Sequence, residues 1–228
     1  MSTVARWITE YDTEEFPFAQ VMLKTLGLRD FSELPSGKDA SVGDPAEVNR
    51  HYRQLLKSLP IDNPLGNLYQ KFVSDFVARH FGKKISLTQR PVLRVQIAHS
   101  PSISGMHRDS EYIGRWDYLN GWLPMLDVPA ESALHVETNY GSGVLEPVPL
   151  RYGQVLFFDA GMLAHGSPSN ETDQPRVSMD FRFVPKSPST LQELIVGSRP
   201  LDLVASAQAN FALLHRTPAQ SSDSAEPT

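Results

Sequence analysis

The chain has 228 residues, enough for one domain with a well-buried core. Its formal charge of −5 lacks the basic excess of a nucleic-acid-binding protein, and the absence of cysteine excludes disulfides, thiolate metal sites and cysteine nucleophiles. Residues 1–18 carry charge where a signal peptide needs an apolar core, and no apolar run is long enough for a membrane span, so we expect a cytoplasmic protein that binds neither membranes nor nucleic acid.

The first third of the chain predicts helices. The segment Asp44-Pro45-Ala46-Glu47 is a strong helix start, and this helix is expected to end near Leu59. Apolar residues recur at three- and four-residue spacing from Leu65 to Phe81, and Gly82 stands where a C-cap belongs. Amphipathic helices usually cover a sheet, so we expect support for the fold here and no chemistry.

After Lys84 the pattern changes to short strands separated by Gly, Pro, Asn and Asp. Such a pattern is typical of an antiparallel sandwich or barrel. Strands are expected over residues 92–98, 119–126, 133–138, 153–158 and 176–184.

These elements predict one domain over residues 1–216, followed by a disordered tail. Its expected parts are mainly helical support over residues 1–84, a β core over 85–186, and a C-terminal helical segment over 187–216, with helices from Leu191 and across Leu201 to Leu214. Residues 217–228, rich in Ser, Ala, Pro and acids, form the tail.

Three metal-ligating side chains stand at a spacing that a sheet can use. His107 and Asp109 are two residues apart, so in a strand they point the same way, and His165 would come from a distant strand. Two imidazoles and one carboxylate form the facial triad that binds non-haem Fe(II) and leaves coordination positions open. A lone His-x-Asp arises by chance, so the prediction depends on its conjunction with His165 and with a downstream arginine, Arg176.

His135 and Glu137 form a rival pair of ligand types two residues apart. Leu134 and Val136, on the opposite face, fit a core, and His135 has no following partner except His165. We therefore interpret His135 as a strand histidine near the site.

The segment from Arg176 to Phe183 alternates without a break. Its polar face carries Arg176, Ser178, Asp180 and Arg182, and its apolar face would pack against helices. A buried arginine needs an anionic partner. That partner of Arg176 could be the carboxylate of a metal-bound molecule, with Ser178 as a further donor, or it could be Asp180; Arg182 is the better candidate to pair with Asp180.

The sequence resembles the 2-oxoglutarate/Fe(II)-dependent dioxygenase superfamily in six runs: QRPVLRVQ, MHRDSEY, LNGWLPMLDV, SALHVET, GQVLFFDAGMLAHGSPSN and PRVSMDFRFVP. Within it, the chain is most similar to the branch of the streptomycin-biosynthesis StrG-type proteins and, more distantly, to phytanoyl-CoA-hydroxylase-like enzymes. The resemblance covers about Gln89 to Pro185 and implies a mainly β, double-stranded β-helix (jelly-roll, cupin-like) fold with flanking α-helices. The plain cupin pattern is only loosely matched, with Asp159 where proline is usual.

The resemblance also implies roles for individual residues. His107, Asp109 and His165 would hold Fe(II), and Arg176 and Ser178 would bind the distal carboxylate of the co-substrate 2-oxoglutarate, with O2 as the second co-substrate.

Four neighbours of this set are expected near the co-substrate. Asn120 and Trp122 resemble family positions that flank it, and Arg94 and Gln96 would share its cavity and could touch the co-substrate or the substrate.

The substrate itself is less specified. Tyr112, Arg115 and Trp116, after the His-x-Asp pair, could stack on or pair with a polar molecule, or could belong to a solvent loop with one buried aromatic. The resemblance to antibiotic-biosynthesis proteins implies a small polar metabolite such as a sugar, aminocyclitol or amino acid derivative, and we expect a monomer or homodimer.

These expectations favour an oxygenase that hydroxylates or oxidatively cyclises such a metabolite. Two other classes stay open: a non-oxidative, cupin-like metal enzyme or sugar-binding module, and a catalytically silent jelly-roll protein that acts through its N-terminal helices.

Overall fold

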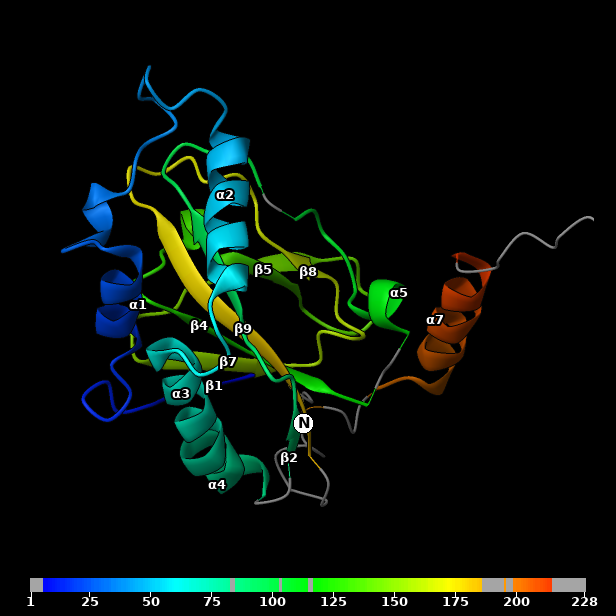
Figure 1. Ribbon diagram of the computed structural model, residues 1–228. Helices are drawn as coiled ribbons and strands as arrows, with labels where there is room; N and C mark the ends of the chain where they lie inside the picture. The colour runs from blue at the N-terminus through cyan, green and yellow to red at the C-terminus, as the bar shows by residue number, and fades with distance from the viewer. Residues whose placement is uncertain are drawn as a thin grey trace, which may run out of the picture.

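The computed structural model describes residues 6–82, 85–102, 104–114, 117–185, 195 and 199–214. Two antiparallel β-sheets form the centre of this part of the chain, with helices α1 to α4 gathered on one side and α5 and α7 on the other (Figure 1). The architecture is thus mainly β with flanking helices, as the sequence predicts.

The larger sheet has six strands, with β1, β7, β4 and β9 side by side. Strands β2 and β3 both pair with the remaining edge of β9, β3 with its first half and β2 with its last residues. The strands are β1 (Arg6–Glu10), β2 (Ile85–Leu87), β3 (Val92–Gln96), β4 (Leu119–Pro124), β7 (Gln154–Phe158) and β9 (Arg176–Pro185).

The smaller sheet has the order β6 (Leu145–Val148), β5 (Leu134–Glu137) and β8 (His165–Gly166). Its buried side chains Leu134 and Val136 share one apolar cluster with Trp122, Leu156 and Phe158 of the larger sheet. The two sheets therefore pack face to face, and the functional side chains described below lie between them.

The helices are α1 (Phe18–Leu26), α2 (Pro45–Ser58), α3 (Pro64–Lys71), the π-helical segment η2 (Phe72–Val77), α4 (Ala78–Phe81), α5 (Ser110–Ile113) and α7 (Leu201–Leu214), with short 3-10 turns η1 (Phe31–Glu33) and η3 (Ala130–Ser132). Helix α2 begins as predicted, because the Asp44 side chain accepts a hydrogen bond from the Ala46 N–H and Pro45 occupies the first turn. None of the helices in the described residues is long and apolar enough to cross a bilayer.

Strand β9 alternates as predicted. Val177, Met179, Phe181 and Phe183 are buried in the cluster that also contains the helical residues of the N-terminal part. The Phe181 ring packs edge-on against the rings of Tyr69 and Phe72, with centroids 5.5 and 6.2 Å away. On the neighbouring strand, a Cβ at Gly121 would lie 2.3 Å from the Phe181 ring, so only glycine fits there.

Two features of the N-terminal region go beyond what the sequence predicts. Residues 1–84 are expected to be mainly helical, and β1, which pairs along its whole length with β7, adds a strand to these helices. The predicted helix from Leu65 to Phe81 is divided into α3, η2 and α4, so its middle is π-helical, although its apolar face is buried as expected. At the other end, α7 agrees with the predicted helix across Leu201 to Leu214, whereas the helix expected from Leu191 and the tail after residue 216 lie outside the described residues, apart from Ile195.

Candidate metal and co-substrate site

Backbone pairing brings the predicted metal ligands together. His107 and His165 exchange both backbone hydrogen bonds, at 2.9 and 2.8 Å, although they are far apart in the sequence. Asp109 lies just beyond this bridge, at the residue before α5, and its N–H donates to the Ala160 carbonyl oxygen at 2.9 Å. Asp109 is therefore not held by a regular strand, as the two-residue spacing suggested, but by the turn into a short helix.

The ligand atoms of the three residues converge. Asp109 Oδ1 lies 3.4 Å from His107 Nε2 and 3.8 Å from His165 Nε2, and the three ligand atoms all lie within 4.8 Å of one another. Each imidazole is oriented by its other nitrogen: His107 Nδ1 donates to the Gly105 carbonyl oxygen at 2.8 Å, and His165 Nδ1 donates to that of Leu163 at 3.0 Å. Orientation of this kind is typical of metal-binding histidines, because it directs the free Nε2 lone pair at the ion.

The electrostatics prepare two of these ligands for a cation. Burial raises the pKa of Asp109, but hydrogen bonds from His107 and Arg182 outweigh burial and hold this pKa well below its usual range. Burial lowers the pKa of His165, while the hydrogen bond to Asp109 raises the pKa of His107. At neutral pH, Asp109 is therefore ionised and His165 neutral, which are the forms that bind a metal ion.

A narrow cavity opens at the three ligands. Its described walls include the polar side chains of Arg94, Asn120, Asp180 and Arg182, together with Trp122. Asn120 Nδ2 lies 3.3 Å from Asp109 Oδ2, and the side-chain oxygen of Asn120 is buried with no hydrogen-bond partner in the part of the chain that the structure describes. Arg94, Asn120 and Trp122, which the sequence analysis expects near a co-substrate, thus line the same cavity as His107, Asp109 and His165.

The pairing of the charged residues in this cavity differs from the expectation. Arg94, and not Arg182, is the partner of Asp180, with Nε 2.8 Å from Asp180 Oδ2. Arg182 instead donates from Nε to Asp109 Oδ2 at 2.7 Å. The alternation of β9 predicts that Arg182 lies on the polar face of the strand. It does not predict the partner, because Asp109 comes from the loop before α5, and no local pattern places that loop opposite Arg182.

Arg176 and Ser178 lie further along the same face of β9. Arg176 is 3% exposed, and its described hydrogen bond is made by Nη1 to the Ser132 carbonyl oxygen at 3.1 Å. Arg176 Nε and Ser178 Oγ are buried and have no hydrogen-bond partner among the described residues. Burial, and to a lesser extent the charge of Arg94, lowers the pKa of Arg176 to about 10. The alternative salt bridge of Arg176 with Asp180 is not formed, because Asp180 pairs with Arg94.

The predicted substrate residues fall in three places. Gln96 is buried, and its amide nitrogen donates to the carbonyl oxygens of Pro101 and Pro168, so it ties loops together and does not line the cavity at the metal ligands. Tyr112, on α5, is 70% exposed, and its ring centroid lies 5.5 Å from that of His107. Arg115 and Trp116 lie outside the described residues.

The rival pair separates in the structure. His135 Nδ1 bonds the Ala133 carbonyl oxygen, and His135 is not part of the cluster of potential metal ligands. Glu137 is fully buried and forms an ion pair with Arg108, the residue between the first two ligands. Sequence reasoning treated Glu137 only as a possible ligand and assigned no role to Arg108.

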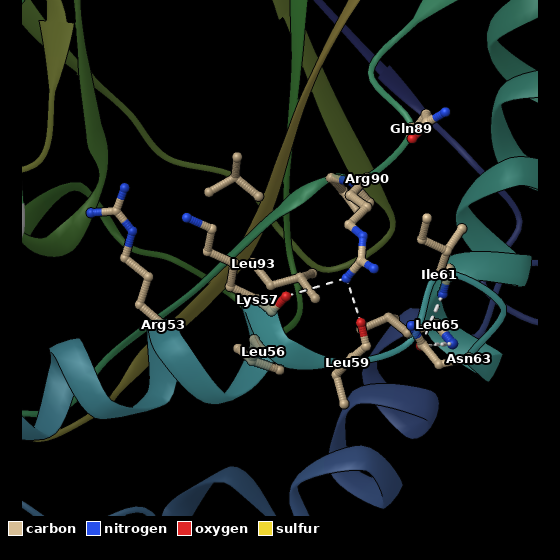
Figure 2. A pocket seen from close by; sticks show the side chains of 13 residues that line it. Arg53, Leu56, Lys57, Leu59, Ile61, Asn63, Leu65, Gln89, Arg90 and Leu93 are labelled. Atoms are coloured by element: carbon tan, nitrogen blue, oxygen red, sulfur yellow. Dashed lines mark hydrogen bonds between the residues drawn. The ribbon is translucent and has the colours of Figure 1, made fainter.

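A separate hollow of about 300 Å³ lies on the other face of β3, between the end of α2, the start of α3 and the segment before β3 (Figure 2). Its described walls combine Leu56, Leu65 and Leu93 with cationic side chains, and Arg90 donates to the Lys57 and Leu59 carbonyl oxygens at the end of α2. Its described walls contain no histidine, aspartate or glutamate, so this hollow offers no metal ligands.

Known structures with a similar fold include a non-haem, α-ketoglutarate-dependent enzyme. The non-haem α-ketoglutarate-dependent carbocyclase SnoK from nogalamycin biosynthesis aligns with a TM-score of 0.52 at 15% identity, over 80% of each chain. AviO1 from Streptomyces viridochromogenes Tue57 aligns with a TM-score of 0.53 at 16% identity, over 81% of this chain and 92% of AviO1. The fold is therefore one that non-haem, α-ketoglutarate-dependent enzymes use, which confirms the expected resemblance at the level of the fold.

By sequence, the chain is similar to the streptomycin biosynthesis protein StrG of Streptomyces griseus. The two are 26% identical over 178 residues, which span 78% of this chain and 83% of StrG. No protein-family model matches the chain.

Proposed function

We propose that this protein is a non-haem Fe(II)- and 2-oxoglutarate-dependent oxygenase. The observation that carries the proposal is the convergence of His107, Asp109 and His165 on one point, with both imidazoles oriented by backbone carbonyl groups. Two histidines and one carboxylate suit Fe(II) and leave positions open for a co-substrate and O2. Bound iron and 2-oxoglutarate would supply the oxidant by reductive activation of O2.

The charges between the sheets support an anionic co-substrate. The cationic side chains Arg94, Arg176 and Arg182 face only two carboxylates, those of Asp109 and Asp180, among the described residues named above. A buried guanidinium without an anion is costly, and Arg176 Nε and Ser178 Oγ are donors that have no acceptor among the described residues. The 2-oxoglutarate carboxylate that is distal to the metal would accept a hydrogen bond from each of these two donors. Its pairing with Arg176 would be a charge-assisted arginine–carboxylate pair.

The remaining residues would orient the reactants. Asn120 and Arg182 hold the carboxylate of Asp109, and Trp122 forms an apolar wall of the cavity beside the ligands. Such groups contribute by fixing geometry and excluding water, while the oxidising power belongs to the bound cofactor.

We also infer that the two sheets form a double-stranded β-helix. In one sheet the strand order is β3-β9-β4-β7. In the other sheet the segment at His107 lies beside β8, followed by β5 and β6, and these two orders support the inference. The chain crosses repeatedly between the sheets, as a jelly-roll requires.

The substrate that we propose is a small polar metabolite of secondary metabolism, such as a sugar, aminocyclitol or amino acid derivative. Its support is the similarity to StrG, which is named a streptomycin biosynthesis protein. The outcome would be hydroxylation or oxidative cyclisation; the carbocyclase SnoK shows that the fold serves ring closure as well.

An anaerobic titration tests the class of enzyme. Fe(II) and then 2-oxoglutarate are added to the metal-free protein, and the visible charge-transfer band of the Fe(II)–2-oxoglutarate chelate is recorded. We expect this band to appear with a 1:1 stoichiometry. Metal binding with no band would favour a non-oxidative metal protein, and the absence of metal binding would indicate a silent fold.

A further inference from the structure

Glu137 is a fully buried carboxylate on β5, close to the metal ligands but not one of them. Its Oε2 accepts from Arg108 Nη2 at 2.9 Å and from the Ala164 backbone N–H at 3.0 Å. Its Oε1 accepts from the Gly143 N–H at 2.8 Å. Glu137 is thus an acceptor for three donors, all of them groups of the protein itself.

Two of these donors belong to the segments that carry the metal ligands. Arg108 stands between His107 and Asp109, and its Nε donates to the Met162 carbonyl oxygen at 3.0 Å. Ala164 directly precedes His165 and also accepts a backbone hydrogen bond from the Glu137 N–H at 2.8 Å. One carboxylate oxygen is therefore bonded to both ligand-bearing segments at once.

We propose that Glu137, acting through Arg108 and Ala164, is a positioning residue that sets the spacing of the metal ligands. This inference rests on the proposed metal site but not on the identity of the co-substrate or substrate. The variable residue of the His-x-Asp motif then has a specific role, because Arg108 turns away from the metal and ties the motif to the strand beside His165.

The geometry makes the negative charge of Glu137 necessary. Glutamine has the same shape but carries one NH2 group in place of an acceptor oxygen. In either orientation that NH2 would face at least one N–H donor, either that of Gly143 or those of Arg108 and Ala164. The part-buried guanidinium of Arg108 would also lose its contact with the buried carboxylate and keep only the longer, 4.0 Å contact with Glu111. Conversely, Arg108→Met would leave the fully buried Glu137 carboxylate without its counter-ion, and breaking a pair in this way costs more than removing both partners.

The test is a comparison of metal binding by folded variants. Glu137→Gln, Arg108→Met and the double variant are titrated anaerobically with Co(II), whose visible d–d spectrum reports coordination geometry, and with Fe(II). We expect each single variant to weaken metal binding by roughly 10- to 100-fold, the usual effect of losing a residue that supports a ligand, and to change the Co(II) spectrum. The double variant is expected to lose no more affinity for the metal than either single variant, because the two residues act as one unit.

Asp159→Asn is the matched control. Asp159 is another buried carboxylate paired with an arginine, but its side chain bonds Tyr140 and Arg199 and neither Arg108 nor Ala164. We expect this variant to lower the free energy of unfolding and to leave the Co(II) spectrum and affinity unchanged.

Two results would overturn the inference. In the first, Glu137→Gln lowers only the unfolding free energy and binds metal as the wild type does. In the second, Asp159→Asn weakens metal binding as strongly as Glu137→Gln. Normal metal binding by the wild type without a 2-oxoglutarate band would instead remove the proposed oxygenase activity and leave the role of Glu137 intact.

Discussion

Arg182 donates from Nε to Asp109 Oδ2 at 2.7 Å, while the other carboxylate oxygen, Oδ1, faces the two histidines. The guanidinium thus occupies the side of the carboxylate that points away from the ligand atoms. It fixes the rotation of the carboxylate and keeps Oδ1 directed at the metal position.

The first prediction follows from this contact. Arg182→Met should weaken Fe(II) binding by roughly tenfold, because an oriented carboxylate becomes free to rotate. Isothermal titration calorimetry of the metal-free protein with Co(II) or Fe(II) measures the change in metal affinity. Arg151→Met, which removes an exposed arginine distant from the ligands, should leave the affinity unchanged. Equal affinities of the Arg182→Met variant and the wild type would contradict the role given to Arg182.

The second prediction concerns the ligands themselves. His165→Ala and Asp109→Ala should each abolish or strongly weaken the chelate band of Fe(II) with 2-oxoglutarate, because each removes one of the three proposed protein ligands. His135→Ala is the matched control, since it removes a histidine of the neighbouring strand that is not in the ligand cluster. A band of normal intensity in either ligand variant would disprove the assignment of the metal site.

The third prediction separates stability from function at Arg176. Arg176→Met should weaken 2-oxoglutarate binding by at least about tenfold, since a charge-assisted hydrogen bond is worth about 1.5–3 kcal/mol. The same change should leave the unfolding free energy of the ligand-free protein unchanged or raised, because a buried cation with unmatched donors is replaced by an apolar side chain. Ser178→Ala should have a smaller effect on 2-oxoglutarate binding. Both quantities are measured, by titration of the chelate band and by chemical denaturation.

A loss of stability in Arg176→Met with unaltered 2-oxoglutarate affinity would reverse this prediction. It would mean that Arg176 is a structural residue and that the anchor of the co-substrate lies elsewhere.

The fourth prediction is a pH dependence of the metal-free protein. The lowered pKa of Asp109 contributes stability that is present above its ordinary value of 3.8 and is lost as the pH falls through the lower, folded value. The raised pKa of His107 contributes stability that is present below its ordinary value of 6.5 and is lost as the pH rises through the folded value. The stabilisation from this pair should therefore be greatest between these two ordinary values.

Denaturation of the metal-free protein at a series of pH values checks this dependence. Asp109→Asn removes the acid-labile member of the pair, so its unfolding free energy should change less with pH across this range. Parallel pH profiles for the variant and the wild type would show that the pair does not stabilise the fold.

Local patterns were sufficient to predict part of the site. In β9 the alternation of Arg176, Ser178, Asp180 and Arg182 with apolar residues has a period of two, which fixes the face of each side chain without further information. Alternation within β3 places Arg94 on the face of the cavity, and the resemblance alone pointed to Asn120 and Trp122; all three line the cavity that contains His107, Asp109 and His165.

Other relationships depend on pairings between distant segments. The N-terminal strand β1 was missed because its partner β7 lies more than a hundred residues later, and its own five residues carry no distinctive pattern. The partners of Arg182 and Glu137 could not be predicted for a related reason: alternation gives the face of a side chain but not the residue that lies opposite it. The sequence shows that Glu137 is a residue type that can bind a metal ion, which makes it a possible ligand. It does not show the three donors that occupy its carboxylate in the structure.

Strand β9 contributes to both the hydrophobic core and the candidate site, one from each of its faces. One face supplies phenylalanines to the core, and the other supplies charged groups to the site. A register slip of one residue would exchange them, setting arginines against the helices and aromatic rings in the cavity. Mispaired β9 therefore yields a chain that neither folds nor binds ligand, so an inactive but well-folded register isomer is not expected among the products of refolding.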